Sequence, residues 1–79
     1  MVKGQNTFEL PANVPYANIC SVIVELGWYM LPSPALNPTN GEIDNSYAIS
    51  VTLVPEGLIL TANSDWGSRD LYAVFFVKH

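Results

Sequence analysis

The alternation of apolar and polar side chains between Ser46 and Val54 constrains the fold of this chain more than any other feature. The residues on one side of an extended backbone are Tyr47, Ile49, Val51 and Leu53, and those on the other side are Ala48, Ser50 and Thr52. This period of two is typical of a β-strand with one buried face. A Pro55-Glu56-Gly57 turn signal follows, and residues 58–62 return as an apolar segment. The sequence therefore predicts a β-hairpin over residues 46–62.

Three other segments have the composition of strands. They are Asn6–Leu10, Cys20–Met30, in which Gly27 marks a bulge or kink, and Leu71–Lys78. No segment combines a helical period with capping residues. We therefore expect an all-β fold in which residues 1–79 form one small antiparallel β-sandwich of about six strands, with no helix longer than one turn. Cys20 begins an apolar strand without a basic neighbour, so we expect a buried thiol there.

A long polar segment, Leu31–Asn45, separates the second strand from the hairpin. Its turn-forming residues are Pro32, Pro34, Pro38, Asn40 and Gly41, and it has no periodic apolar pattern. Loops of this length in small domains are usually functional or disordered. Because proline limits the entropy that a loop loses on ordering, we expect this loop to be ordered by its prolines and by packing against a neighbouring subunit.

The size of the chain favours oligomerisation. Domains of about 80 residues or fewer usually depend on disulfides, a metal or a partner subunit, and this chain has 79. Cys20 is the only cysteine, so no disulfide forms within the chain. One cysteine and one histidine, His79, cannot complete a zinc site, so we expect no metal and no cofactor. A partner subunit is the stabilising element that remains.

The closing strand is apolar on both faces. One face carries Leu71, Ala73, Phe75 and Val77, and the other carries Tyr72, Val74 and Phe76. Large aromatic side chains left exposed on the second face would form a patch of the kind that marks an interface. Either a loop of the same chain covers this face or a second copy does. We favour self-association, with Tyr72, Val74 and Phe76 at the oligomer interface.

Composition argues against several classes of function. The net charge is −4, and the basic residues Lys3, Arg69 and Lys78 are too few to bind nucleic acid or an anionic membrane. The apolar run Ile19–Met30 is too short for a membrane span, no secretory signal is visible, and one free cysteine suits folding in a reducing cytoplasm.

Catalysis is not expected either. His79, at the chain end, is difficult to hold in a preorganised site, and no nucleophile motif or phosphate-binding glycine loop occurs. The acid pairs Glu42 with Asp44 and Asp65 with Asp70 lie in loops, where solvated carboxylates are the ordinary interpretation. We therefore expect no enzyme activity.

One loop has the composition of a ligand site. Residues 63–70 bring together an aromatic ring, a guanidinium and several acceptors, which is what a sugar requires: a flat apolar surface and hydrogen bonds to its hydroxyls. The candidate ligand-binding residues are Trp66, Arg69, Asp65, Asn63 and Tyr47. An equally good interpretation is structural, with Trp66 closing the end of the sandwich and Arg69 paired with Asp65 or Asp70.

The order of short motifs along the chain resembles a known family. The motifs are Thr7-Phe8-Glu9-Leu10-Pro11, Val14-Pro15-Tyr16-Ala17, Asn45-Ser46-Tyr47-Ala48-Ile49-Ser50-Val51, Pro55-Glu56-Gly57-Leu58 and the terminal Leu71-Tyr72-Ala73-Val74-Phe75. This order is similar to that of the small carboxy-terminal domains of bacteriophage tail fibres, which are themselves similar to H-type lectins.

The resemblance implies a six-stranded antiparallel β-sandwich that assembles as a homotrimer and recognises a carbohydrate or host surface near subunit boundaries. Trp66 and Arg69 occupy the loop that supplies the sugar site in H-type lectins. Gly67 stands where those lectins have a histidine, so their sugar specificity does not carry over.

Three functions remain open. The first is a receptor-binding tip domain of a trimeric phage tail fibre, with a host cell-surface glycan as the receptor, made in the host cytoplasm and carried in the virion. The second is a structural trimerisation or folding module of a fibre. The third is a small viral inhibitor of a host protein.

Overall fold

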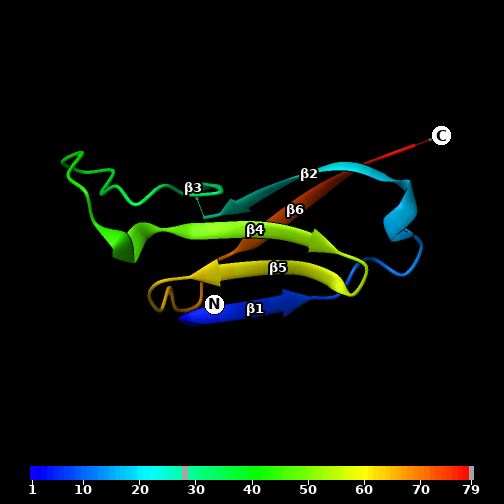
Figure 1. Cartoon of the computed structure of the whole chain (residues 1–79), viewed down its shortest axis with the longest axis horizontal. Helices are drawn as coiled ribbons and strands as arrows, with labels where there is room; N and C mark the ends of the chain where they lie inside the picture. The colour runs from blue at the N-terminus through cyan, green and yellow to red at the C-terminus, as the bar shows by residue number, and fades with distance from the viewer. Residues whose placement is uncertain (28, 79) are drawn as a thin grey trace.

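Six strands form two three-stranded antiparallel sheets in the computed structural model, which describes residues 1–27 and 29–78 (Figure 1). The strands are β1 (Gly4–Phe8), β2 (Ile19–Leu26), β3 (Tyr29–Leu31), β4 (Ile49–Val54), β5 (Gly57–Ala62) and β6 (Leu71–Val77). The helical turns η1 (Tyr16–Asn18) and η2 (Asn45–Tyr47) have three residues each. The predicted small β-sandwich is confirmed, whereas the likeness to H-type lectins stays a prediction. His79, judged unsuited to catalysis, lies outside the described residues.

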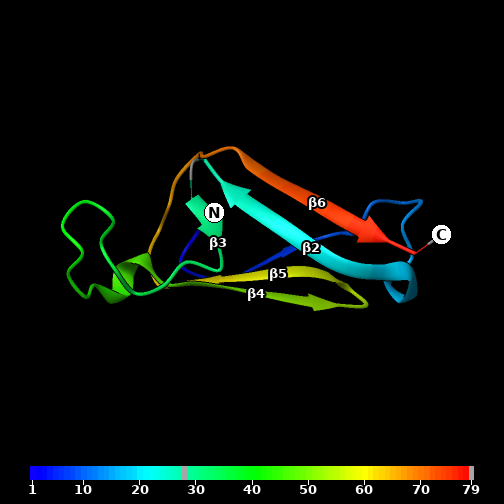
Figure 2. The ribbon, with the colours of Figure 1, turned by 90° about the horizontal axis from the view of Figure 1, so that it is seen from above.

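The first sheet has the order β1-β5-β4 and the second has the order β3-β2-β6. Figure 2 shows the second sheet running diagonally above the first, with β6 on the side of β2 away from β4 and β5. The buried core between the sheets consists of Val24, Leu26, Leu31, Ile49, Leu58, Leu60 and Ala62. The described residues contain no buried polar or charged side chain, so the core is apolar throughout.

The hairpin predicted from residues 46–62 is present as β4 and β5, although its first strand starts later than expected. Ile49 is buried and Ser50 and Thr52 are exposed, as the period of two requires. Tyr47 belongs to η2 rather than to the strand. Gly57, the first residue of β5, has a φ of +149°, and a Cβ there would collide with the carbonyl oxygen of Phe8 in β1. The turn therefore requires glycine.

The segment predicted as one strand over Cys20–Met30 is a second hairpin. Leu26 pairs with Tyr29, so β2 and β3 are antiparallel partners and the chain reverses at Gly27, whose φ is +60°. Glycine adopts this left-handed conformation without steric cost. The chain therefore reverses direction at Gly27, where the sequence predicted only a bulge or kink. This reversal brings Tyr29 back beside the end of β2.

The prediction of a buried Cys20 is wrong, because this residue is exposed. The register between β2 and β6 shifts between Ile19 and Ser21, so Cys20 is the extra residue of a β-bulge. A bulge interrupts the alternation of side chains between the two faces of a strand. The pattern of apolar residues in the sequence does not show where such a bulge occurs. Cys20 therefore does not join the core.

The loop between β3 and η2 projects from the body of the sandwich (Figure 1). Hydrogen bonds within the loop hold it: the N–H of Asn37 donates to the carbonyl of Glu42 at 2.8 Å, and that of Asp44 donates to the carbonyl of Ala35 at 2.9 Å. Leu31, expected in this loop, is the buried last residue of β3. The order of the loop thus has a local source, and its packing against a neighbouring subunit stays a prediction.

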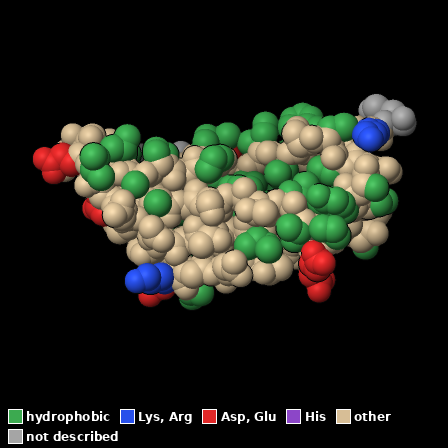
Figure 3. Space-filling model, viewed as in Figure 1, with side chains coloured by type: hydrophobic (Ala, Val, Ile, Leu, Met, Phe, Trp, Pro, Cys, Tyr) green, Lys and Arg blue, Asp and Glu red, His purple; other side chains and the backbone are tan. Residues whose placement is uncertain are grey.

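The outer face of the second sheet is apolar and uncovered. Tyr72, Val74 and Phe76 are 63%, 54% and 48% exposed, so within the described part of the chain no loop covers them, and that interpretation is wrong. The strand register adds Ile23, beside Val74, to the same face. Apolar side chains gather along the upper edge of Figure 3, where Figure 1 places β2. No helix within residues 1–27 and 29–78 has the length and hydropathy of a membrane span.

Candidate functional site

The loop that follows β5 places Trp66 at one end of the sandwich. Its backbone N–H donates to the carbonyl of Met1 at 3.0 Å, which ties the loop to the start of β1. The indole is half-buried and packs against the apolar core. Its Nε1 atom is buried without a hydrogen-bond partner among the described residues. Trp66 therefore closes the end of the sandwich, as the structural interpretation of the sequence proposed.

Two tyrosines meet the same indole from other parts of the chain. The rings of Tyr29, in β3, and Trp66 have centroids 5.4 Å apart at an interplanar angle of 70°. The ring of Tyr47, in η2, lies 5.8 Å from that of Trp66 at 73°. Edge-to-face pairs of this kind contribute about 0.5–1.5 kcal/mol each beyond the area that they bury. The three rings therefore form a defined aromatic cluster.

The guanidinium of Arg69 lies over the indole, with its central carbon 5.6 Å from the ring centroid. Such a cation–π contact holds the guanidinium in place without consuming its N–H donors. Within the described part of the chain, Arg69 forms no ion pair or hydrogen bond, so the predicted pairing with Asp65 or Asp70 does not occur. Its donors are available to a ligand.

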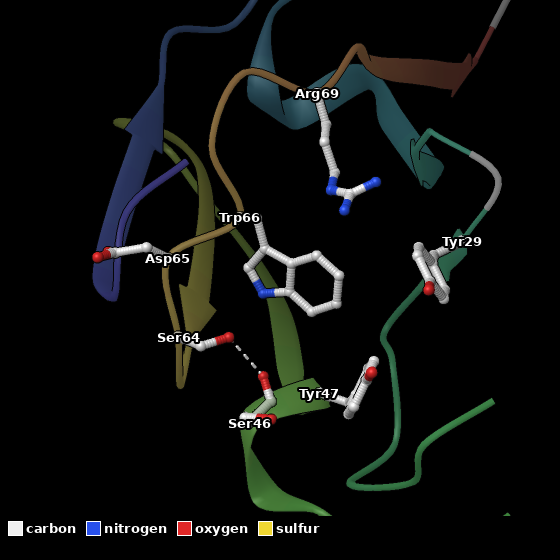
Figure 4. A pocket seen from close by; sticks show the side chains of 7 residues that line it. All are labelled: Tyr29, Ser46, Tyr47, Ser64, Asp65, Trp66 and Arg69. Carbon is white, nitrogen blue, oxygen red and sulfur yellow. Dashed lines mark hydrogen bonds between the residues drawn. The ribbon is translucent and has the colours of Figure 1, made fainter. Parts of the chain in front are cut away.

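These side chains surround a cavity of about 240 Å³. The lining residues are Tyr29, Ser46, Tyr47, Ser64, Asp65, Trp66 and Arg69 (Figure 4). The hydroxyl of Ser64 donates to the carbonyl of Ser46 at 2.7 Å, so its proton is already engaged. The cavity consequently combines aromatic side chains with the Arg69 guanidinium and serine oxygens.

The carboxylate of Asp65 faces away from this cavity. It accepts a hydrogen bond of 2.7 Å from the backbone N–H of Lys3, and Figure 4 shows it pointing away from the indole. The donor, Lys3, lies one residue before β1. Asp65 fixes the loop to β1, and the structure does not bring its carboxylate to the ligand site that the sequence suggested.

Asn63 also lies outside the cavity. Its backbone N–H donates to the carbonyl of Ala48 at 3.2 Å, and the residue lines a different hollow beside Pro32 and Thr61. Of the five predicted site residues, the structure thus brings the side chains of three together: Trp66, Arg69 and Tyr47. Sequence reasoning missed Tyr29, Ser46 and Ser64. The one available signal was Gly27, because a reversal there places Tyr29 at the same end as the loop.

Asp44 holds the turn that carries Tyr47. Its Oδ1 accepts hydrogen bonds from the hydroxyl of Ser46 at 2.7 Å and from the backbone N–H of Ser46 at 3.0 Å. These bonds favour the ionised form and lower the pKa of Asp44 below its ordinary value of 3.8, the hydroxyl contributing most. The ionised carboxylate thereby fixes the position of one wall of the cavity.

The arrangement is suited to binding through rings and a guanidinium. No group of three or more His, Cys, Asp or Glu side chains that could hold a metal ion occurs in the described ranges. The expected absence of enzyme activity stays a prediction. Comparison of the chain with family models, with curated proteins and with solved structures finds no match in any of the three.

Proposed function

We propose that this chain is a receptor-binding tip domain of a trimeric phage tail fibre, carried in the virion, and that it recognises a host-surface glycan at the Trp66 cavity. The observation that carries the proposal is the unpaired guanidinium of Arg69 beside three aromatic rings. Sugars offer apolar ring faces and hydroxyl acceptors, which match aromatic side chains and a fork of N–H donors.

The size of the cavity fits a single sugar unit. Its volume of about 240 Å³ lies below the roughly 300–1,000 Å³ of pockets that enclose drug-sized ligands. A site of this kind buries little ligand surface, so one copy binds weakly. Several copies on one fibre tip raise the overall affinity through effective concentration without any new contact.

The surface area of the chain supports self-association. Its accessible surface is 5364 Å², whereas a compact monomer of 8.7 kDa exposes about 4,700 Å². Its radius of gyration is 13.4 Å, against about 11.6 Å for a compact domain of this length. The chain thus exposes more surface than a compact monomer, on the projecting loop and on the outer face of the second sheet.

The edge of β6 supports the same conclusion. The N–H of Gly27 donates to the carbonyl of Asp70 and the N–H of Lys78 donates to the carbonyl of Asn18, both at 2.8 Å. The direction of the backbone N–H and C=O groups alternates along an antiparallel strand. In β6, those of the even-numbered residues point to β2, and those of the odd-numbered residues point to the open edge of the sheet. No charge or proline protects this edge between Leu71 and Val77. A second copy of the chain would pair with the backbone groups at this edge and would cover the exposed apolar face.

The first test is the mass of the purified full chain in solution, measured by light scattering. A trimer with glycan binding supports the proposal, and a monomer contradicts it. Binding is then measured on a glycan array with Arg69→Gln and Tyr47→Ala, both of which alter the cavity. Asn63→Ala is the matched control, because this residue belongs to the same loop but lies outside the cavity.

The alternatives predict different results in the same experiments. A trimer that binds no glycan at all would favour the structural module, because its exposed strand would serve assembly only. A monomer that captures one host protein would favour the inhibitor.

A further inference from the structure

The cavity beside Trp66 has a single charged group directed into it. Arg69 lies over the indole, whereas the carboxylate of Asp65 faces β1 and that of Asp44 is engaged by Ser46. This positive site occurs on a chain whose net charge is −4 and which has only three basic residues. The sign of the charge inside the cavity is therefore opposite to that of the molecule as a whole.

The polar groups of the cavity are poorly matched to a neutral sugar. Sites for neutral sugars need acceptors for hydroxyl protons, and carboxylates are the strongest of these because they carry charge and two oxygens. The carboxylate that could have served, that of Asp65, accepts the N–H of Lys3 instead. The hydroxyl protons of Ser46 and Ser64 are engaged by Asp44 and by the Ser46 carbonyl, so these serines donate to no ligand and Arg69 is the charged donor of the cavity.

The guanidinium is suited to a carboxylate. Its planar fork of N–H donors matches the two oxygens of a carboxylate and forms two parallel hydrogen bonds. Stacking on Trp66 restricts its position before a ligand arrives. Less conformational entropy is therefore lost when the guanidinium forms its two hydrogen bonds.

From these contacts we infer that the cavity binds a saccharide unit bearing a carboxylate, with the carboxylate on Arg69 and the sugar ring against the tyrosines. This inference rests on the proposed function and names the ligand class of the same site. The unit is a single acidic residue rather than part of a polyanion, because the net charge of −4 repels a long acidic polymer.

The test compares matched acidic and neutral sugars by calorimetric titration of the full chain. The pairs are glucuronic acid with glucose and sialyllactose with lactose, and they separate a free sugar acid from the end of a glycan. Acetate tests the carboxylate without a ring. At least one acidic sugar should bind tenfold or more tightly than its neutral partner and than acetate, and added salt should weaken it.

Two variants isolate the role of Arg69. Arg69→Gln should reduce binding of the acidic sugar at least tenfold, to the level of the neutral one. Lys3→Gln removes the same unit of charge while leaving the backbone N–H that binds Asp65, so its binding should stay within twofold of the unmodified chain.

The outcomes distinguish this inference from the proposed function. Equal binding of acidic and neutral sugars, lost in Tyr47→Ala, would overturn the acidic specificity and leave the glycan site in place. Equal losses in Arg69→Gln and Lys3→Gln would also overturn it, since net charge alone would then explain the binding. Absence of binding by every sugar would overturn both proposals.

Discussion

Asp44 accepts two hydrogen bonds from one residue, Ser46: its Oδ1 lies 2.7 Å from the hydroxyl oxygen and 3.0 Å from the backbone nitrogen. These bonds define the start of η2, which carries Tyr47 into the candidate site. The wall of the cavity therefore depends on the charge of a residue that does not line it.

This dependence predicts how stability varies with pH. The pKa of Asp44 in the folded chain is below its ordinary value of 3.8, so the stabilisation is complete above pH 3.8 and is lost as the pH falls through the folded value. Asp44→Asn should lower the unfolding temperature near neutral pH, and the difference from the unmodified chain should disappear in stronger acid. A difference that persists unchanged at low pH would exclude the ionised carboxylate as its source.

Gly57→Ala tests the packing of the hairpin turn against β1. The added Cβ meets the carbonyl oxygen of Phe8, and alanine is also strained at a φ of +149°. Gly41→Ala is the control for a positive φ without a collision, because at +72° alanine adopts the left-handed conformation and no atom lies within 4 Å of the added Cβ. We expect Gly41→Ala to cost about 1 kcal/mol and Gly57→Ala about 2 kcal/mol more in urea unfolding. If the two variants lose the same free energy of unfolding, β1 moves away from the added Cβ without destabilising the protein.

Trp66→Phe and Trp66→Ala distinguish the contribution of the aromatic ring to stability from that of its N–H group. The indole packs against the core, so Trp66→Ala should cost about 3 kcal/mol in urea unfolding. The buried Nε1 has no partner, and an unsatisfied donor costs about 1–3 kcal/mol. Trp66→Phe removes that cost together with some apolar surface, so it should lie within about 1 kcal/mol of the unmodified chain. A loss as large as that of the alanine variant would show that the N–H is satisfied in solution.

Two substitutions in β6 distinguish its exposed face from its open edge. Phe76→Asp places a carboxylate on the face and should yield monomers or insoluble protein if the face is buried in the oligomer, because burial of an unpaired charge is costly. Ala73→Pro removes an N–H that points outward and leaves the ladder to β2 intact. Light scattering on Ala73→Pro should then give a monomer if a neighbouring strand pairs with this edge. If both variants remain fully assembled, β6 is not the interface.

The elements that sequence predicted well are those set by neighbours along the chain. The β4–β5 hairpin follows from the alternation at Ile49, Val51 and Leu53 and from the glycine at position 57, which are local features. Cys20 was misplaced because one extra residue in a bulge exchanges the two faces of a strand. Nothing in the composition around Cys20 marks that insertion.

The candidate site was harder to predict because its parts come from distant segments. Trp66 and Arg69 share one loop, and their proximity could be read from the sequence. Tyr29 joins them only because the chain reverses at Gly27, and Tyr47 only because η2 precedes β4. Asp65 was expected in the cavity on composition alone, and a backbone donor at the start of β1 determined its direction instead.

The attachment of the Trp66 loop to the start of β1 has a consequence for the order in which the protein folds. Lys3 and Asp65 are separated by 62 residues, and the bond between them closes a loop of nearly the whole chain. Contacts of such long range form late, because the entropy of closing the loop must be lost before the contact stabilises anything. We therefore expect the contact between the Trp66 loop and the start of the chain to form late in folding, and a partly folded chain to lack the complete cavity.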